Sequence, residues 1–293
     1  GGFLIGLLNT YLFTRKGTFS EEEFGLYNVF IAIALLLAAV GNMGAPYFIY
    51  KFFPYYKDRF RSNGNDQLTI ALTLGAIGLI LMLVGGQLFE PLIIGKYGTN
   101  SPLLIHYFNW VFPLAAGLLL FNILESWSWQ HQLSVKSNLL KEGIWRLYIL
   151  ILILLFIGSD THSFDRFIYF FAFSYPFIAL VLIAILYHKK KLPITLHFSS
   201  LTKRLKKPIF NYTSFTYFGT LIFVIAQVFD SILIPSVLEN ALAQLAVYSL
   251  AQNFASMLQA PQRGVIAASM EPLSRAWKEK DRNTLNRIYQ RSA

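Results

Sequence analysis

Long apolar runs alternate with short polar segments along the whole chain of 293 residues. A helix must present about 20 apolar residues to cross roughly 30 Å of bilayer hydrocarbon, because each residue adds about 1.5 Å. The runs lack the strict alternation of barrel strands. The pattern therefore predicts an all-α, polytopic transmembrane bundle of eight spans, with the first one truncated: 1–13, 27–49, 68–89, 103–124, 137–158, 167–187, 209–234 and 242–258.

The fifth predicted span is interrupted by charged residues in its first half. Its uninterrupted apolar part, Leu147 to Ile157, is too short to cross a bilayer alone. It must extend backward through Arg146 and Lys141, whose long stems can carry their charges to the headgroups.

Small residues and prolines within the predicted spans indicate bends and close contacts. The GxxxG spacing of Gly2 and Gly6 is typical of tight helix packing. Candidate bends lie where glycine or proline interrupts an apolar run. These are Gly41, Gly44, Pro46, Pro113, Pro176, Pro235 and Pro261.

Composition supports an integral membrane protein. Hydrophobic residues make up 55% of the chain and charged residues 14%, whereas soluble domains carry about 25% charged residues. The chain has no cysteine, which excludes disulfides and thiolate chemistry, and its five histidines form no pair with metal-ligand spacing. We therefore expect neither a metal nor a cofactor, and no catalytic residues.

Basic residues predict the orientation. All but four of the 25 Lys and Arg residues fall in alternate connections, the exceptions being Arg15, Lys16, Lys96 and Arg166. Basic loops stay in the cytoplasm, which places the N-terminus there. This distribution explains the net charge of +10 without nucleic-acid binding, and the basic loops can contact anionic membrane lipids.

The two ends of the chain suggest a fragment. The opening GGFLIG lacks both a methionine and a charged segment ahead of the apolar run. The last segment has apolar positions spaced for short amphipathic helices at the membrane surface. These are Leu273, Trp277, Leu285, Ile288 and Tyr289, and we expect a further span beyond them.

A weak internal repeat joins the second and eighth spans. Gly25-Leu26-Tyr27 and Ala246-Val247-Tyr248 stand at corresponding outer ends, and each span leads toward a proline, Pro54 or Pro272, before a basic segment. Repeated halves are common in transporters, with the substrate site between them.

Three stretches carry a resemblance to a known family: LFTRKGTFSEEEFGLYNVF from Leu12, FDSILIPSVLENALAQLAVYSLAQNF from Phe229, and PLSRAWKEKDRNTLNRIYQRSA from Pro272. Together they resemble the polysaccharide-biosynthesis flippases of the multidrug/oligosaccharidyl-lipid/polysaccharide exporter superfamily. The segment PSVLENAL departs from the family's usual glycine-containing turn, which affects the loop geometry. Members have two six-helix lobes around a central cavity.

The resemblance implies a domain organisation and a function. It implies a first lobe over 1–187, a basic cytoplasmic linker over 188–208, two helices of a second lobe over 209–260, and an amphipathic connector over 261–293. The implied activity is flipping of a lipid-linked oligosaccharide on a polyprenyl carrier across the bacterial inner membrane, alongside glycosyltransferases or a polymerase of the same pathway.

Asp230 is a candidate for ion coupling, with Gln227 beside it. An ionisable residue within a span costs roughly 2.5–3.5 kcal/mol on insertion scales, so it should face protein or water. It can bind a proton or cation during transport. It can equally be a structural cap or ion pair near the outer interface, with Arg15 or Lys16.

Candidate substrate contacts lie in several spans. Arg263 and Asn42 occupy matching places in the repeat, and Arg146 is a second candidate cation. The planar guanidinium of arginine matches phosphate oxygens. Both arginines can equally be topology anchors whose charges reach the headgroups. Gln252, Asn253 and Asn9 can line a cavity or simply join helices, the latter worth about 0.6 kcal/mol each.

Alternatives to the flippase stay open. A cation-coupled multidrug exporter shares the architecture but should have carboxylates in its cavity, and we count only Asp230, with Glu125 at an inner end. An enzyme acting on the same lipid carrier needs a large catalytic outer loop, and the longest, 89–102, is short. A truncated, non-transporting membrane protein is the remaining possibility.

Overall fold

The structure is a computed structural model that describes residues 2–15, 18–59, 65–156, 163–195, 199–238, 240–255 and 280–292. The chain forms two compact units, residues 1–246 and residues 247–293. Each unit is described by itself below.

The described residues form helices and contain no strand, which confirms the predicted all-α class. Residues 241–255 are also helical. The other helices are α1 (Gly2–Thr14), α2 (Glu21–Gly41), α3 (Ala45–Arg59), α4 (Gln67–Tyr97), α5 (Pro102–Tyr107), the 3-10 turn η1 (Phe108–Trp110), α6 (Val111–Gln130), α7 (Ser134–Leu139), the π-helix η2 (Leu140–Ile144), α8 (Trp145–Phe156), α9 (Ser163–Ala172), α10 (Ser174–His188), α11 (Ser200–Val237) and α13 (Arg282–Ser292).

Helix α2 begins at a capping box. The Glu23 backbone amide donates to Ser20 Oγ at 3.2 Å, and the Ser20 amide donates to Glu23 Oε2 at 2.6 Å. This reciprocal pair satisfies two backbone N–H donors at the helix start. The carboxylates of Glu21, Glu22 and Glu23 in the first turn interact favourably with the positive end of the helix dipole. The start of α2 is therefore fixed by local sequence.

The predicted second span is broken into α2 and α3. Met43 and Gly44 have φ values of 45° and +77°, in the left-handed region. Pro46 has no N–H to continue the helical ladder across this point. The break follows from the glycine and proline that indicated a bend, and it leads the chain into α3.

Some of the other predicted bends lie close to a change in helix geometry, and others do not. The 3-10 turn η1 directly precedes α6, whose third residue is Pro113, and a break at Phe173 separates α9 from α10 shortly before Pro176. Pro235, in contrast, lies inside α11 without ending it. Pro261 lies outside the described residues.

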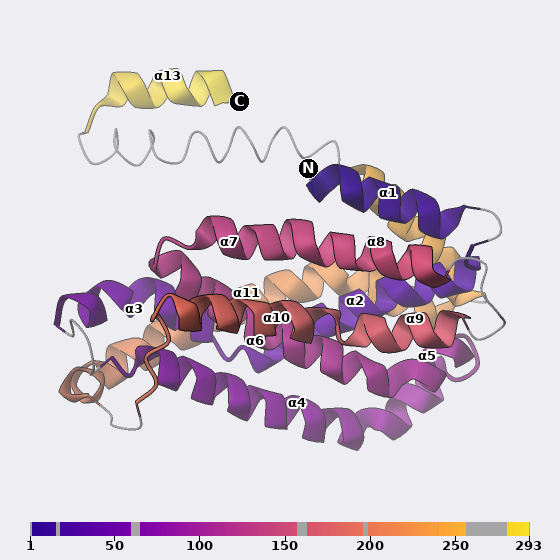
Figure 1. Ribbon diagram of the computed structural model, residues 1–293, viewed down its shortest axis with the longest axis horizontal. Coiled ribbons are helices and arrows are strands. Elements are labelled where there is room, and N and C mark those ends of the chain that lie inside the picture. The colour runs from indigo at the N-terminus through magenta and orange to yellow at the C-terminus, as the bar shows by residue number, and fades with distance from the viewer. Residues whose placement is uncertain are drawn as a thin grey trace. The chain divides into compact units, whose positions relative to one another are not determined.

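Helix α6 is central in the first unit. It packs against α10, α2, α3 and α4, while α11 packs along α2 and α3 and α1 lies on α8. Figure 1 shows several of these helices running along the same direction. The core between them is aromatic and aliphatic, and Trp127, Phe121 and Phe48 are among its fully buried side chains.

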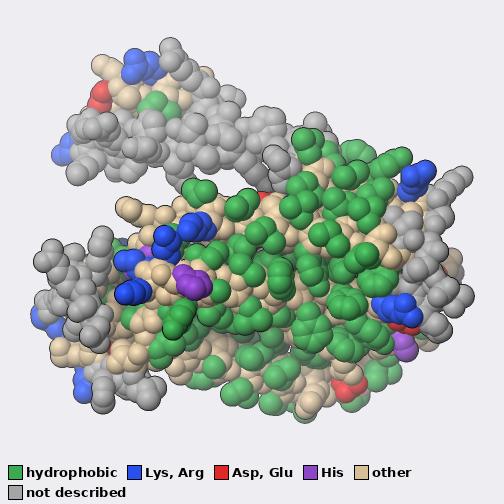
Figure 2. Space-filling model, viewed as in Figure 1, with side chains coloured by type: hydrophobic (Ala, Val, Ile, Leu, Met, Phe, Trp, Pro, Cys, Tyr) green, Lys and Arg blue, Asp and Glu red, His purple; other side chains and the backbone are tan. Residues whose placement is uncertain are grey.

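The surface of this unit is strongly apolar. Leu88, Phe215 and Leu155 expose more than half of their area. Figure 2 shows hydrophobic side chains spread over the middle of the visible face, with Lys and Arg toward the ends of the bundle. Such an apolar belt suits lipid, since water would make this exposure unfavourable.

Within the described residues, five helical segments are long and apolar enough to cross a membrane: Glu21–Gly41, Gln67–Tyr97, Pro102–Gln130, Phe164–His188 and Ser200–Val237. The predicted fifth span is also helical, over α7, η2 and α8, but the π-helix divides it. The protein is therefore a multi-pass membrane protein.

The described part of the second unit consists of residues 247–255, which continue a helix begun in the first unit, and residues 280–292. In α13, Leu285 and Ile288 are half-buried and Tyr289 is exposed. The α13 segment is amphipathic, with Arg282 and Arg287 among its exposed positions. Leu273 and Trp277 lie outside the described residues.

Candidate functional site

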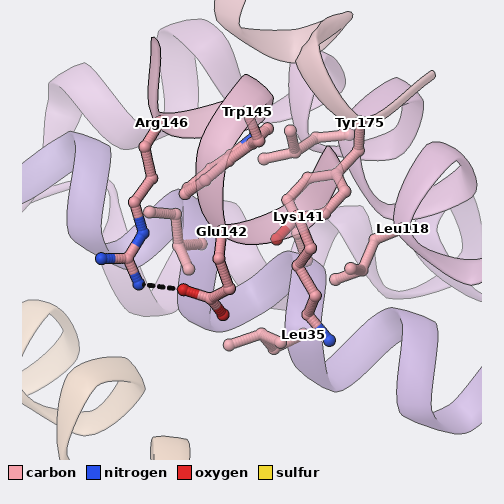
Figure 3. A pocket seen from close by; sticks show the side chains of 10 residues that line it. Leu35, Leu118, Lys141, Glu142, Trp145, Arg146 and Tyr175 are labelled. Carbon is pink, nitrogen blue, oxygen red and sulfur yellow. Dashed lines mark hydrogen bonds and ion pairs between the residues drawn. The ribbon is translucent and has the colours of Figure 1, made fainter. Parts of the chain in front are cut away.

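A cavity of about 190 Å³ opens within the first unit, among α2, α6, η2, α8 and α10. Its walls are mostly apolar, but one side carries charged and aromatic groups, shown in Figure 3. The lining residues are Ile31, Ala34, Leu35, Leu114, Leu118, Lys141, Glu142, Trp145, Arg146 and Tyr175.

The polar side of the cavity is built on the π-helix η2. A π-turn places one more residue in the turn than an α-helix does and is frequently found at functional sites. Here η2 holds Lys141 and Glu142, and Trp145 and Arg146 follow in the first turn of α8. All four residues line the same cavity.

Two ion pairs neutralise the charges on this side. Arg146 Nη2 lies 2.5 Å from Glu142 Oε2, and Lys141 Nζ lies 3.2 Å from Glu125 Oε2. The side-chain exposure is 55% for Glu142 but only 10% for Glu125. The four groups therefore sum to zero charge, and the Glu142 carboxylate is much the more accessible of the two.

Helix α1 lies close to Arg146. A Cβ atom at Gly6 would lie 2.7 Å from Arg146 Nη1, so any other residue at this position would require the guanidinium to shift. One turn further, Asn9 Nδ2 donates to the Arg146 carbonyl at 2.9 Å, while the buried Asn9 Oδ1 has no hydrogen-bond partner among the described residues. The small residue predicted for helix packing thus contacts a charged side chain.

An aromatic pair forms the adjoining wall. The Trp145 and Tyr175 rings are tilted with centroids 5.1 Å apart, and Trp145 Nε1 donates to the buried Ser174 Oγ at 3.1 Å. These contacts hold the Trp145 ring between α8 and α10. The cavity therefore joins a cation, a carboxylate and two aromatic faces.

Of the predicted site residues, the structure brings Arg146 and Asn9 together. Asn42 is half-buried at the end of α2, and its Oδ1 atom is buried without a hydrogen-bond partner in the described part of the chain. Asp230 and Gln227 are exposed on α11, and Gln252 and Asn253 are exposed on the helix of residues 241–255. Arg263 lies outside the described residues.

Glu142, Trp145 and Tyr175 also line the cavity and were not predicted from the sequence. Glu142 lies inside the predicted fifth span, so Asp230 and Glu125 were not the complete set of intramembrane carboxylates. The scarcity of such carboxylates therefore speaks less strongly against a cationic cargo. A usable signal was present, because Glu142 stands four residues before Arg146, the spacing of a same-face helical ion pair.

The fold and cavity define the class, a multi-pass membrane helix bundle with a charged cavity between its helices. The chain belongs to the polysaccharide biosynthesis protein family, whose family model matches residues 1–270. Members are typically membrane transporters or flippases. This match confirms the family resemblance. Among curated proteins and solved structures, none matches the chain.

Proposed function

We propose that this chain belongs to a flippase for a polyprenyl-linked oligosaccharide. The cargo crosses from the cytoplasmic to the outer leaflet of the inner membrane, by alternating access, and serves polysaccharide or lipopolysaccharide synthesis. Glycosyltransferases of the same pathway supply the cargo. Family membership and the multi-pass bundle support this proposal.

The observation that carries the proposal is the placement of Arg146 in a cavity between apolar helices. A diphosphate headgroup cannot enter hydrocarbon without compensation for its lost hydration. Arginine offers a planar fork of donors that matches phosphate oxygens. The aromatic faces of Trp145 and Tyr175 provide a surface for the adjoining sugar or isoprenoid.

Other polar residues complete the proposed path. Arg263, Asn42, Gln252 and Asn253 are further contacts for the headgroup. Asp230 and Gln227 couple movement of the cargo to a proton or cation. The Lys and Arg distribution supports a cytoplasmic N-terminus.

A cation-coupled multidrug exporter is the second candidate. The Glu142 carboxylate beside Trp145 and Tyr175 is the observation that favours it, because a carboxylate and aromatic faces suit an organic cation. This candidate function predicts that a cationic dye competes with the diphosphate lipid for the cavity, or that the dye is transported and the lipid is not.

The test is flipping of a fluorescent polyprenyl-diphosphate oligosaccharide by the intact protein in proteoliposomes. Arg146→Gln should lower the rate by about tenfold or more, since hydrogen bonds to charged groups contribute about 1.5–3 kcal/mol. Arg166→Gln is the matched control, because Arg166 is exposed on α9 and does not line the cavity. Equal rates for both variants would contradict the proposal.

A further inference from the structure

We propose that Glu142 is an internal counter-ion that occupies Arg146 between cargo molecules and is displaced by the diphosphate of the cargo. The inference rests on the proposed function and adds a specificity-determining residue to it. Glu142 would then set how tightly the cavity holds an anionic headgroup and how readily it releases one.

The distances and exposures show which partner can move. Arg146 is confined on one side by Gly6 and has 26% of its side chain exposed, against 55% for Glu142. In Figure 3 the Glu142 carboxylate and the Arg146 guanidinium meet at the cavity wall, joined by the marked ion pair. An exchange of partners is therefore achieved by rotation of Glu142 while the guanidinium stays in place.

Charge balance explains why a counter-ion is needed. A lone guanidinium between apolar helices is unfavourable, and a carboxylate one helical turn away neutralises it. A diphosphate brings more negative charge and more acceptor oxygens than one carboxylate, so it can replace Glu142 at the guanidinium. A neutral lipid offers no such replacement and leaves the ion pair closed.

The second ion pair is less open to exchange. Glu125 has only 10% of its side chain exposed and lies 3.2 Å from Lys141. Displacing it would leave a buried carboxylate without its cation, which is strongly unfavourable. Glu142, which is far more exposed, is the carboxylate that a cargo can displace.

The experiment measures binding of farnesyl diphosphate, a short isoprenoid diphosphate, to the intact protein in nanodiscs, with farnesol as the neutral probe. Glu142→Gln removes the competing charge and should lower the dissociation constant for the diphosphate by about tenfold, with no change for farnesol. Glu142→Asp keeps the charge on a shorter side chain and should tighten binding by a smaller factor. Glu22→Gln is the matched control, because Glu22 is exposed at the start of α2.

The double variant separates this inference from the proposed function. In an Arg146→Gln background, Glu142→Gln should give no tightening, because the two residues act on the same phosphate. If Arg146→Gln loses binding but Glu142→Gln and Glu142→Asp bind the diphosphate as wild type does, the counter-ion role is wrong and the flippase proposal stands. If the wild type binds no diphosphate, both are wrong.

Discussion

The side chain of Ser101 donates a hydrogen bond from Oγ to the backbone carbonyl of Pro235, 2.8 Å away, and so ties the start of α5 to the end of α11. Asn100 Nδ2 donates to the neighbouring Ser236 carbonyl at 3.2 Å. The last carbonyls of a helix have no partner within it, and here the loop before α5 supplies two donors. The end of α11 is thereby attached to the loop that precedes α5.

Removal of this attachment should lower stability. Ser101 is fully buried. Ser101→Ala leaves the Pro235 carbonyl without its donor and should reduce the free energy of unfolding by about 1 kcal/mol. Denaturant unfolding of the purified protein in detergent measures this. Thr73→Ala is the control, because Thr73 is exposed and bonds only within its own helix. An equal loss in both variants would argue against the attachment.

The other end of α11 depends on Asp66. The buried Asp66 Oδ2 accepts hydrogen bonds from Ser199 N and Thr202 Oγ1, both at 2.8 Å. Asp66→Ala should reduce the free energy of unfolding by about 3 kcal/mol, since two hydrogen bonds to a charged group are lost. Asp66→Asn, which keeps an acceptor oxygen, should cost less. Thermal unfolding measures the stability of both variants. A larger loss of stability for Asp66→Asn than for Asp66→Ala would contradict the role of Asp66 as a hydrogen-bond acceptor.

The flipping rate should be sensitive to any side chain introduced at position 6. Gly6→Ala places a methyl group against the Arg146 guanidinium and should reduce flipping several-fold, while the thermal stability of the protein changes little. A matched control is Gly85→Ala, because a Cβ atom there meets open space. If Gly6→Ala flips cargo as fast as Gly85→Ala, the position of the guanidinium is not critical.

Helix α13 should show a dependence on pH through Asp281. The Thr284 hydroxyl, with the backbone amides of Thr284 and Asn283, donates to the Asp281 carboxylate and holds its pKa below the usual value of 3.8. These hydrogen bonds cap the N-terminus of α13. Because the pKa of Asp281 is lower in the folded state, the cap is fully formed above pH 4 and is lost as the pH falls through the folded-state pKa.

Hydrogen exchange over residues 281–292 of the intact protein measures this loss. Protection should decrease with acidification in the wild type, after correction for the intrinsic exchange rate. Asp281→Ala should show weak protection at every pH. A wild-type protection factor that is constant down to pH 2 would contradict the cap.

Asp230 is the proposed coupling residue. Asp230→Asn should leave binding of the diphosphate lipid unchanged but abolish the dependence of flipping on the proton or sodium gradient. Transport assays with imposed gradients measure this, with Asp281→Asn as a control outside the predicted spans. Gradient dependence that persists in Asp230→Asn would assign Asp230 a structural role at the helix end.

Much of the fold follows from the sequence because membrane spans are set by length and apolarity. The break after α2 was also predictable from Gly44 and Pro46. The π-turn at Leu140 to Ile144 was not, because its sequence has no feature that separates it from an α-helical turn.

The site was harder to predict than the fold. A span that is apolar on all sides gives no periodicity that shows which face turns inward. The contact of Gly6 with Arg146 joins residues 140 positions apart and depends on how α1 and α8 are rotated. Arg146 and Asn9 were identifiable as rare polar residues within spans, whereas Trp145 and Tyr175 look like ordinary apolar wall residues.

The most direct test asks whether the cavity is wet and takes the headgroup. The chain has no cysteine, so a single thiol can be introduced at Leu35 in the cavity or at Leu83, which is similarly exposed on α4. In proteoliposomes of the intact protein, we expect a charged methanethiosulfonate reagent to label Leu35→Cys but not Leu83→Cys, and the polyprenyl-diphosphate oligosaccharide to block that labelling. Absence of labelling at position 35, or labelling that the lipid does not change, would contradict the account.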